Sequence, residues 1–169
     1  MEEVSLQEML AAREHRSALQ IRLLQQYKKS LISFTLNIPG PVKVPDGVPQ
    51  AFATGCRRIE ALLKDRLVLV QHMETIKEKT GYEAFYCIDA NPEFIKTLMV
   101  TLEDQDRLGR LFDIDVIRPD GSKVSREELG RPSRTCLLCK EPAHACSRSR
   151  RHSVAELTAE IGHILKDLY

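Results

Sequence analysis

The stretch GRLFDIDVI, residues 109–117, alternates apolar and acidic side chains through its second half. In an extended strand successive side chains point to opposite faces, so Asp113 and Asp115 share one face. The other face carries Phe112, Ile114 and Val116. Two carboxylates at this spacing lie about 7 Å apart along a strand, near enough to hold one Mg²⁺ or two adjacent ions. The stretch therefore predicts a half-buried strand with a metal-binding pair on its open side.

Gly109 and Arg110 begin the same stretch. A glycine allows a phosphate to approach the backbone closely, and an arginine can pair with a phosphate through two hydrogen bonds. Beside two metal-binding acids, these residues fit phosphoryl or nucleotidyl transfer, in which a metal neutralises a polyphosphate and orients the leaving pyrophosphate. Many amphipathic strands expose acids without binding any ligand, so a plain solvent-facing strand is the alternative.

The segments around this strand predict a sheet with helices packed on it. Asn91 as N-cap, followed by a proline at the first helical position, begins a helix that leads directly into the strand. Further strands are predicted at 31–38, 66–76 and 82–88, with a turn at Thr80–Gly81. Helices are predicted at 5–29, 50–64 and 153–168. This order indicates the α+β class, a mixed sheet with flanking helices.

The predicted long N-terminal helix carries an apolar stripe with a polar gap. Ser5 and Glu8 have the spacing of a capping box at its start. The stripe consists of Leu6, Leu10, Leu24 and Tyr27. Helical spacing places Arg13, Arg16 and Gln20 in or beside the gap. These three side chains either face solvent on a curved helix or form one wall of a binding site.

The turn PGPVK, residues 39–43, follows the strand predicted at 31–38. Two prolines around Gly40 stiffen this turn and hold Lys43 at a fixed position near a strand end. Lys43 then either serves an anion-binding site or is a solvated loop lysine.

The chain has 169 residues, of which 43% are hydrophobic and 29% charged, and a formal net charge of +1. This length predicts one domain over 1–169, with a Cys- and Arg-rich C-terminal subregion at 131–169. The near-zero charge gives no global attraction to nucleic acid or to a membrane. The acidic start MEEVSLQEML and the lack of a long apolar segment lead us to expect a cytoplasmic protein without a signal peptide or membrane span.

Three of the five cysteines lie close together in the C-terminal subregion, which in a reducing compartment favours a metal or free thiols over disulfides. The spacing Cys136-x2-Cys139-x6-Cys146-x5-His152 offers four ligands for a structural Zn²⁺ site. His144 competes as the fourth ligand. The alternatives are a cluster of reduced cysteines and a nucleophilic thiol activated by its basic neighbours.

Five arginines surround these cysteines: Arg131, Arg134, Arg148, Arg150 and Arg151. They form either a solvated basic face or a binding surface for a compact polyanion. Nucleic acid fits less well, because this basic segment has no aromatic residue on which bases could stack.

Four motifs occur in order along the chain: REHRSALQ at 13–20, PGPVK at 39–43, GRLFDIDVI at 109–117 and RTCLLCKEPAHACSRSRRH at 134–152. Together they resemble the apo-citrate lyase phosphoribosyl-dephospho-CoA transferase family, also called holo-citrate lyase synthase. The resemblance extends over nearly the whole chain. It implies transfer of the phosphoribosyl-dephospho-CoA group from triphosphoribosyl-dephospho-CoA to a serine of the citrate lyase acyl carrier protein, the gamma subunit, with release of pyrophosphate. It also implies, by analogy, a nucleotidyltransferase-like fold.

The resemblance also implies roles for individual residues. Asp113 and Asp115 become the Mg²⁺-binding pair at the reacting phosphate. The candidates to bind the triphosphate or ribose are Arg13, Arg16, Gln20, Lys43, Gly109, Arg110 and Arg134. This sequence departs from the family pattern at Asp106-Arg107, where the family often has His-Pro, so no acid–base role is carried over to that position.

Two competing hypotheses come from other readings of the same residues. In the first, the chain is a zinc-stabilised, non-catalytic adaptor that binds lyase subunits through its basic face. In the second, it is a nucleotidyltransferase that acts on a small molecule. Zinc content, pyrophosphate release and the mass of the carrier protein distinguish these hypotheses from transfer to the carrier.

Overall fold

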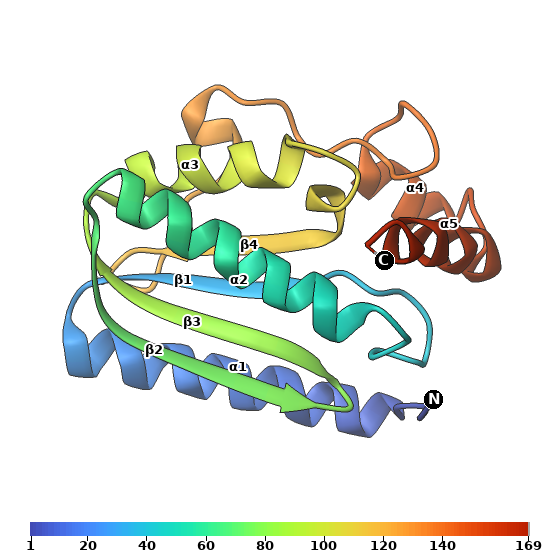
Figure 1. The fold of residues 1–169 in the computed structure, drawn as a ribbon, viewed down its shortest axis with the longest axis horizontal. Helices are drawn as coiled ribbons and strands as arrows, with labels where there is room; N and C mark the ends of the chain where they lie inside the picture. The colour runs from blue at the N-terminus through green and yellow to red at the C-terminus, as the bar shows by residue number, and fades with distance from the viewer. Residues whose placement is uncertain (169) are drawn as a thin grey trace.

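The structure of the protein is a computed structural model that describes residues 1–168. Its main elements are α1 (Leu6–Tyr27), β1 (Ser30–Leu36), α2 (Val48–Asp65), β2 (Leu69–Glu78), β3 (Gly81–Asp89), α3 (Pro92–Asp104), β4 (Phe112–Ile117), α4 (Ala143–Ser149) and α5 (Val154–Lys166). Figure 1 shows three layers, with α2 and α3 on one side of the sheet and α1 along the opposite side. The short α4 and α5 lie together at one end of these layers.

The four strands form one sheet in the order β2-β3-β1-β4. All three neighbouring pairs are antiparallel. Helix α2 links β1 to β2 around β3, and α3 links β3 to β4 around β1, which is the β-α-β-β-α-β arrangement of a split βαβ fold. The α+β class is therefore confirmed. A mixed sheet was expected, whereas all neighbouring strands of this sheet are antiparallel. The reason is that each crossover passes over an intervening strand, so the two parallel strands that it joins are not neighbours.

The two faces of the sheet are covered by different helices because strand side chains alternate. On β1, Ile32 and Phe34 join the main core under α2 and α3, whereas Leu31 packs in a smaller cluster with Leu23 of α1. Gly55 of α2 lies directly against the Phe34 ring, where an added Cβ would come within 2.3 Å of Cζ. This close approach brings α2 onto the sheet.

Several element boundaries differ from the prediction for local reasons. The strand predicted at 66–76 begins only at Leu69, because α2 continues to Asp65 and Leu67 takes a positive φ of 57° in the turn. The strand predicted from Gly109 begins at Phe112, because Gly109–Leu111 forms a 3-10 turn. The short α4 was not predicted. The capping box at Ser5 and the N-caps at Asn91 and Ser153 are present as side-chain hydrogen bonds.

Within residues 1–168, no helix combines the length and the apolar character that crossing a membrane would require.

Candidate functional site

Asp113 and Asp115 lie on the same face of β4, as the alternation predicted. They stand opposite Thr35 and Ser33 of β1, respectively. Strand β4 is at the edge of the sheet, and α1 packs mainly over β1 and β3. This side of β4 is therefore open, and Asp113 is exposed while Asp115 is partly exposed.

Helix α3 fixes the backbone between the two aspartates. The Ile114 N–H donates to Glu103 Oε2 at 3.0 Å, and the Ile114 carbonyl accepts from Lys96 Nζ at 2.8 Å. Glu103 and Lys96 are buried, and Arg126 donates to Glu103 Oε1 at 2.7 Å. An edge strand normally leaves such backbone groups to solvent. Here side chains satisfy them, which holds both carboxylates in a fixed orientation.

The electrostatic surroundings disfavour a negative charge on Asp113. Burial raises the pKa of this carboxyl, and the nearby carboxylates Asp115 and Glu103 raise the pKa further. Although part of the side chain contacts solvent, the protein atoms around it displace much of its hydration shell. Asp115 instead has a cationic partner, since Lys123 Nζ lies 3.1 Å from its Oδ2. A cation bound beside Asp113 would relieve its unfavourable charge.

A small cavity of about 140 Å³, which we call the aspartate cleft, adjoins Asp113. Arg13 and Arg16 of α1 and Lys43 of the turn after β1 line it together with Asp113. Three of the predicted cationic residues thus meet at the predicted acid. Arg13 and Arg16 lie about one helical turn apart, and Lys43 comes from a distant part of the sequence. Two of the three polar residues predicted in or beside the gap of α1 therefore line a cavity, whereas Leu6 and Leu10 of the predicted apolar stripe are exposed.

The three cations of the aspartate cleft differ in how they are already engaged. Arg16 Nε donates to Glu83 Oε1 of β3 at 2.7 Å. Lys43 Nζ donates to the Ile38 carbonyl at 2.7 Å, and burial lowers the pKa of this lysine, followed by the effect of the Arg13 charge. Arg13 forms no ion pair with any residue in 1–168. Arg13 and Lys43 therefore present positive charge that an anion would stabilise.

Gln20 lies farther along α1 and does not line the aspartate cleft. Its Nε2 donates to Ser33 Oγ at 3.0 Å. Ser33 is the residue directly opposite Asp115 on β1. Gln20 therefore ties α1 to the strand beside the second aspartate, and direct contact of Gln20 with a substrate stays a prediction.

Gly109, Arg110 and Arg134 are not gathered at the aspartate cleft. Arg134 donates to the carbonyls of Phe112 and Arg110, at 2.7 and 2.8 Å. Arg110 in turn donates to the Thr135 carbonyl at 2.8 Å. These bonds join the C-terminal subregion to the start of β4. Gly109 is buried, and an added Cβ would lie 2.2 Å from the Leu102 carbonyl oxygen, so close packing explains this glycine.

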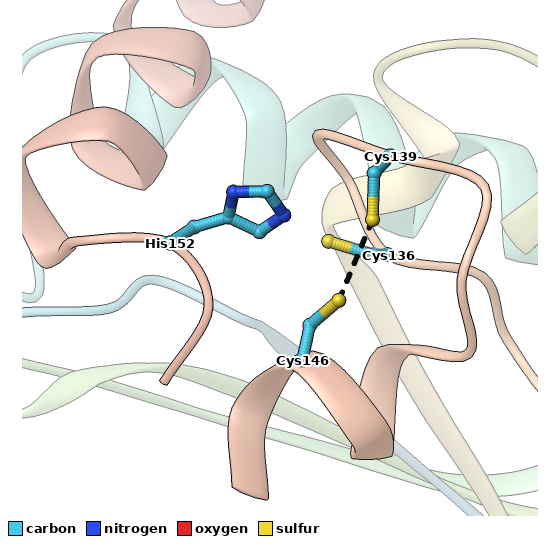
Figure 2. A group of neighbouring side chains, drawn as sticks. All are labelled: Cys136, Cys139, Cys146 and His152. Carbon is cyan, nitrogen blue, oxygen red and sulfur yellow. Dashed lines mark hydrogen bonds between the residues drawn. The ribbon is translucent and has the colours of Figure 1, made fainter. Parts of the chain in front are cut away.

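The C-terminal subregion brings together Cys136, Cys139, Cys146 and His152, whose ligand atoms all lie within 4.8 Å of one another. Figure 2 shows the three sulfur atoms and the imidazole ring pointing toward a common centre. The sulfur atoms of Cys139 and Cys146 are 3.4 Å apart. A tetrahedral site built from three thiolates and one imidazole is typical of zinc. The cluster can therefore hold a metal such as zinc.

His152, rather than His144, completes this cluster. Its Nε2 is buried without a hydrogen-bond partner, and its Nδ1 lies 3.6 Å from Glu156 Oε2. Histidines that bind metals commonly direct their second ring nitrogen toward a carboxylate, which sets the tautomer. An unpartnered buried nitrogen on one side and a carboxylate on the other therefore suit a metal ligand.

Several residues at the site could not be singled out from the sequence. Glu83 of β3 binds the predicted cation Arg16 because α1 packs on the sheet. Lys123, which forms a β-bridge with Ile117, binds the predicted acid Asp115. Asn37, at the end of β1, lines the aspartate cleft and also a larger cavity beside it. Its position two residues before the PGPVK turn is the one sequence signal that could have marked it.

The chain is similar to known proteins over nearly its whole length. The family described as apo-citrate lyase phosphoribosyl-dephospho-CoA transferase matches residues 4–168. A Vibrio cholerae protein described as "Probable apo-citrate lyase phosphoribosyl-dephospho-CoA transferase" is 39% identical over 97% of this chain and 93% of its own length. A Streptococcus pyogenes protein with the same description is 36% identical, over 99% and 88%. A Citrobacter koseri protein described as "Apo-citrate lyase phosphoribosyl-dephospho-CoA transferase" is 34% identical, over 97% and 90%.

Proposed function

Because the chain belongs to the apo-citrate lyase phosphoribosyl-dephospho-CoA transferase family, we propose that it attaches this prosthetic group to the acyl carrier protein of citrate lyase. The donor is triphosphoribosyl-dephospho-CoA. A serine oxygen of the carrier attacks the phosphorus atom nearest the ribose, and a new P–O bond forms. The bond from that phosphorus to the bridging oxygen of the two outer phosphates breaks, so pyrophosphate leaves and the serine proton passes to solvent or a base.

The observation that carries this proposal is the meeting of Asp113 with Arg13 and Lys43 at one small cavity. Two cations from different segments suit the several negative charges of a triphosphate. Lys43 sits in a stiff turn and its charge is disfavoured by burial, so an anion bound there would stabilise the charged form. Arg16, held by Glu83, lines the same cavity about one helical turn from Arg13.

Asp113 and Asp115 would hold Mg²⁺ at this position. Both are on the open face of β4, and burial, followed by the neighbouring charges of Asp115 and Glu103, raises the pKa of Asp113, so a bound cation would stabilise its carboxylate. When bound, the ion would neutralise phosphate charge and stabilise the departing pyrophosphate. The chain itself supplies the orientation, because Glu103 and Lys96 fix the backbone of Ile114 between the two acids.

For the C-terminal cluster we propose that the metal is zinc and that its role is structural. All four positions are filled by protein side chains, which leaves no open position for a substrate or water. Arg110 and Arg134 connect the same subregion to β4. A closed site of this kind would hold residues 134–153 against the start of the strand that carries the aspartates.

A pyrophosphate-release assay tests the proposed reaction. The protein, Mg²⁺ and triphosphoribosyl-dephospho-CoA are incubated with the apo carrier, with a carrier whose acceptor serine is replaced by alanine, or with no carrier. Release only with the unmodified apo carrier supports transfer to that serine. Release without a carrier favours a small-molecule nucleotidyltransferase, and no release in any reaction favours the adaptor.

A further inference from the structure

A larger cavity of about 650 Å³, which we call the C-terminal cavity, lies next to the aspartate cleft. The end of β1, the start of β4 and the C-terminal subregion surround it. Asn37 lines both cavities, and the turn after β1 contributes Pro39 to the larger one and Lys43 to the smaller. The two cavities thus flank one short segment, residues 37–43, and a single elongated molecule could extend from one to the other.

The lining of the C-terminal cavity is positively charged. Among residues 1–168 it includes Arg110, Arg134 and Arg150 but no aspartate or glutamate. The hydrogen bonds of Arg110 go to oxygen atoms of Thr135 and Cys136, so no carboxylate neutralises its charge. Arg150 is exposed at the end of α4. Arg134 lies 3.6 Å from Glu103 Oε2, whereas Arg110 and Arg150 have no carboxylate partner among residues 1–168. Such guanidinium groups favour an anionic ligand, and diphosphates in particular.

The same cavity also has an apolar side. Leu111, Leu137, Val154, Leu157 and Ile161 line it. Its volume is in the range of pockets that bind nucleotides and other small ligands, about 300–1,000 Å³. The aspartate cleft, at about 140 Å³, has room only for a small polar group. An apolar wall combined with the uncompensated charges of Arg110 and Arg150 therefore suits a ligand that contains both apolar parts and phosphate.

We infer that the C-terminal cavity binds the dephospho-CoA part of the donor, while the aspartate cleft takes its triphosphate. This inference rests on the proposed function, which identifies the donor. Dephospho-CoA joins an adenine nucleoside to a pantetheine arm through a diphosphate, so one molecule presents apolar surfaces and negative charge together. The ribose that links it to the triphosphate would lie near Asn37. Arg110 and Arg150 then serve the diphosphate of this arm and leave the triphosphate to Arg13 and Lys43.

The metal cluster forms part of the same wall. Cys136, Cys146 and His152 line the C-terminal cavity as well as the candidate zinc site, and Figure 2 shows them on separate segments that converge. A metal that joins these segments would fix the shape of the cavity. The inference thus gives the C-terminal subregion, remote from the aspartates in sequence, a direct part in holding the donor.

The test is calorimetric titration of the full-length, zinc-loaded protein with dephospho-CoA alone. We expect binding, and we expect Arg150→Glu to weaken it about tenfold, the effect of losing one charge-assisted contact. Arg148→Glu is the matched control, because it makes the same charge change on α4 at an exposed residue that does not line the cavity. Arg13→Ala, in the aspartate cleft, should leave the affinity for dephospho-CoA unchanged.

Absence of dephospho-CoA binding, or equal weakening by Arg150→Glu and Arg148→Glu, would overturn the inference. A parallel reaction with the complete donor and the apo carrier distinguishes failure of this inference from failure of the proposed function. A carrier that gains the prosthetic group while dephospho-CoA does not bind contradicts only the cavity assignment. A carrier that gains no mass contradicts the proposed function, whatever the titration gives.

Discussion

Glu103 of α3 accepts a hydrogen bond at 3.0 Å from the backbone N–H of Ile114, the residue between Asp113 and Asp115. This contact places a buried carboxylate behind the edge strand that carries the two candidate metal ligands. Arg126, itself buried, neutralises Glu103 at 2.7 Å. The orientation of the aspartates therefore depends on an ion pair on the core side of β4.

Replacing Glu103 with alanine should destabilise the protein by about 3–5 kcal/mol, because Arg126 is left as an unpaired buried charge and Ile114 loses its partner. Urea denaturation measures this change. Asp104→Ala is the matched control, since Asp104 is a more exposed partner of the same arginine and its loss should cost about 1 kcal/mol or less. Similar losses for the two variants would contradict the role given to Glu103.

Gly109→Ala should destabilise the protein by about 1–3 kcal/mol, because the new methyl group would lie 2.2 Å from the Leu102 carbonyl oxygen and the turn before β4 would have to move. Gly162→Ala provides the comparison. A Cβ at Gly162, inside α5, meets no neighbouring atom, so alanine there should add about 0.5–1 kcal/mol through better helix propensity. If thermal unfolding shifted in the same direction for both variants, the packing explanation for Gly109 would be wrong.

The raised pKa of Asp113 predicts that this carboxyl stabilises the folded protein less as the pH rises. The folded-state pKa lies above the ordinary value of 3.8, so the carboxyl favours the folded state while protonated and loses this contribution as the pH rises through the folded pKa. In metal-free buffer Asp113→Asn should therefore unfold at the same temperature as the unmodified protein below pH 3.8, and roughly 1–3 °C higher at pH 7. A lower unfolding temperature for the variant at pH 7 would contradict this electrostatic account.

Metal analysis should find one zinc ion per chain, bound by the C-terminal cluster. Removing it with a chelator should lower the unfolding temperature by about 8 °C or more, as expected for loss of a tightly bound ligand, and should expose residues 131–153 to proteolysis. Cys139→Ser should lose the zinc. Cys56→Ser should keep it, because Cys56 lies outside the cluster. A zinc-free protein that is unaffected by chelators would favour a cluster of reduced thiols.

The parts of this account that depend on local periodicity could be predicted from the sequence. Alternation along 112–116 placed Asp113 and Asp115 on one face, and helical spacing marked Arg13 and Arg16 in a polar gap. Ligand spacing likewise marked the cysteines, although only the structure distinguishes His152 from His144. Each of these features is determined by residues a few positions apart in the chain.

The parts that depend on contacts between distant segments could not be predicted in this way. Arg110 carries the residue type of a phosphate ligand, yet its hydrogen bonds go to residues 135 and 136, which no local pattern brings near. The order of strands and helices along the chain also does not determine which strands are neighbours. A helix between two strands can join a neighbouring parallel pair, or it can cross an intervening strand, as α2 crosses β3 and α3 crosses β1 here. Arg126 gave no signal, since its partner Glu103 belongs to another element.

The most direct test of the central claim is the intact mass of the apo carrier after incubation with this protein, Mg²⁺ and triphosphoribosyl-dephospho-CoA. The unmodified protein should add the mass of one phosphoribosyl-dephospho-CoA group per carrier. Asp113→Asn should slow this addition at least about 100-fold, the size typical of losing one transition-state contact, while Asp65→Asn, an exposed acid at the end of α2, should act at the normal rate. Full activity of the Asp113→Asn protein, or no mass gain with the unmodified one, would contradict the account.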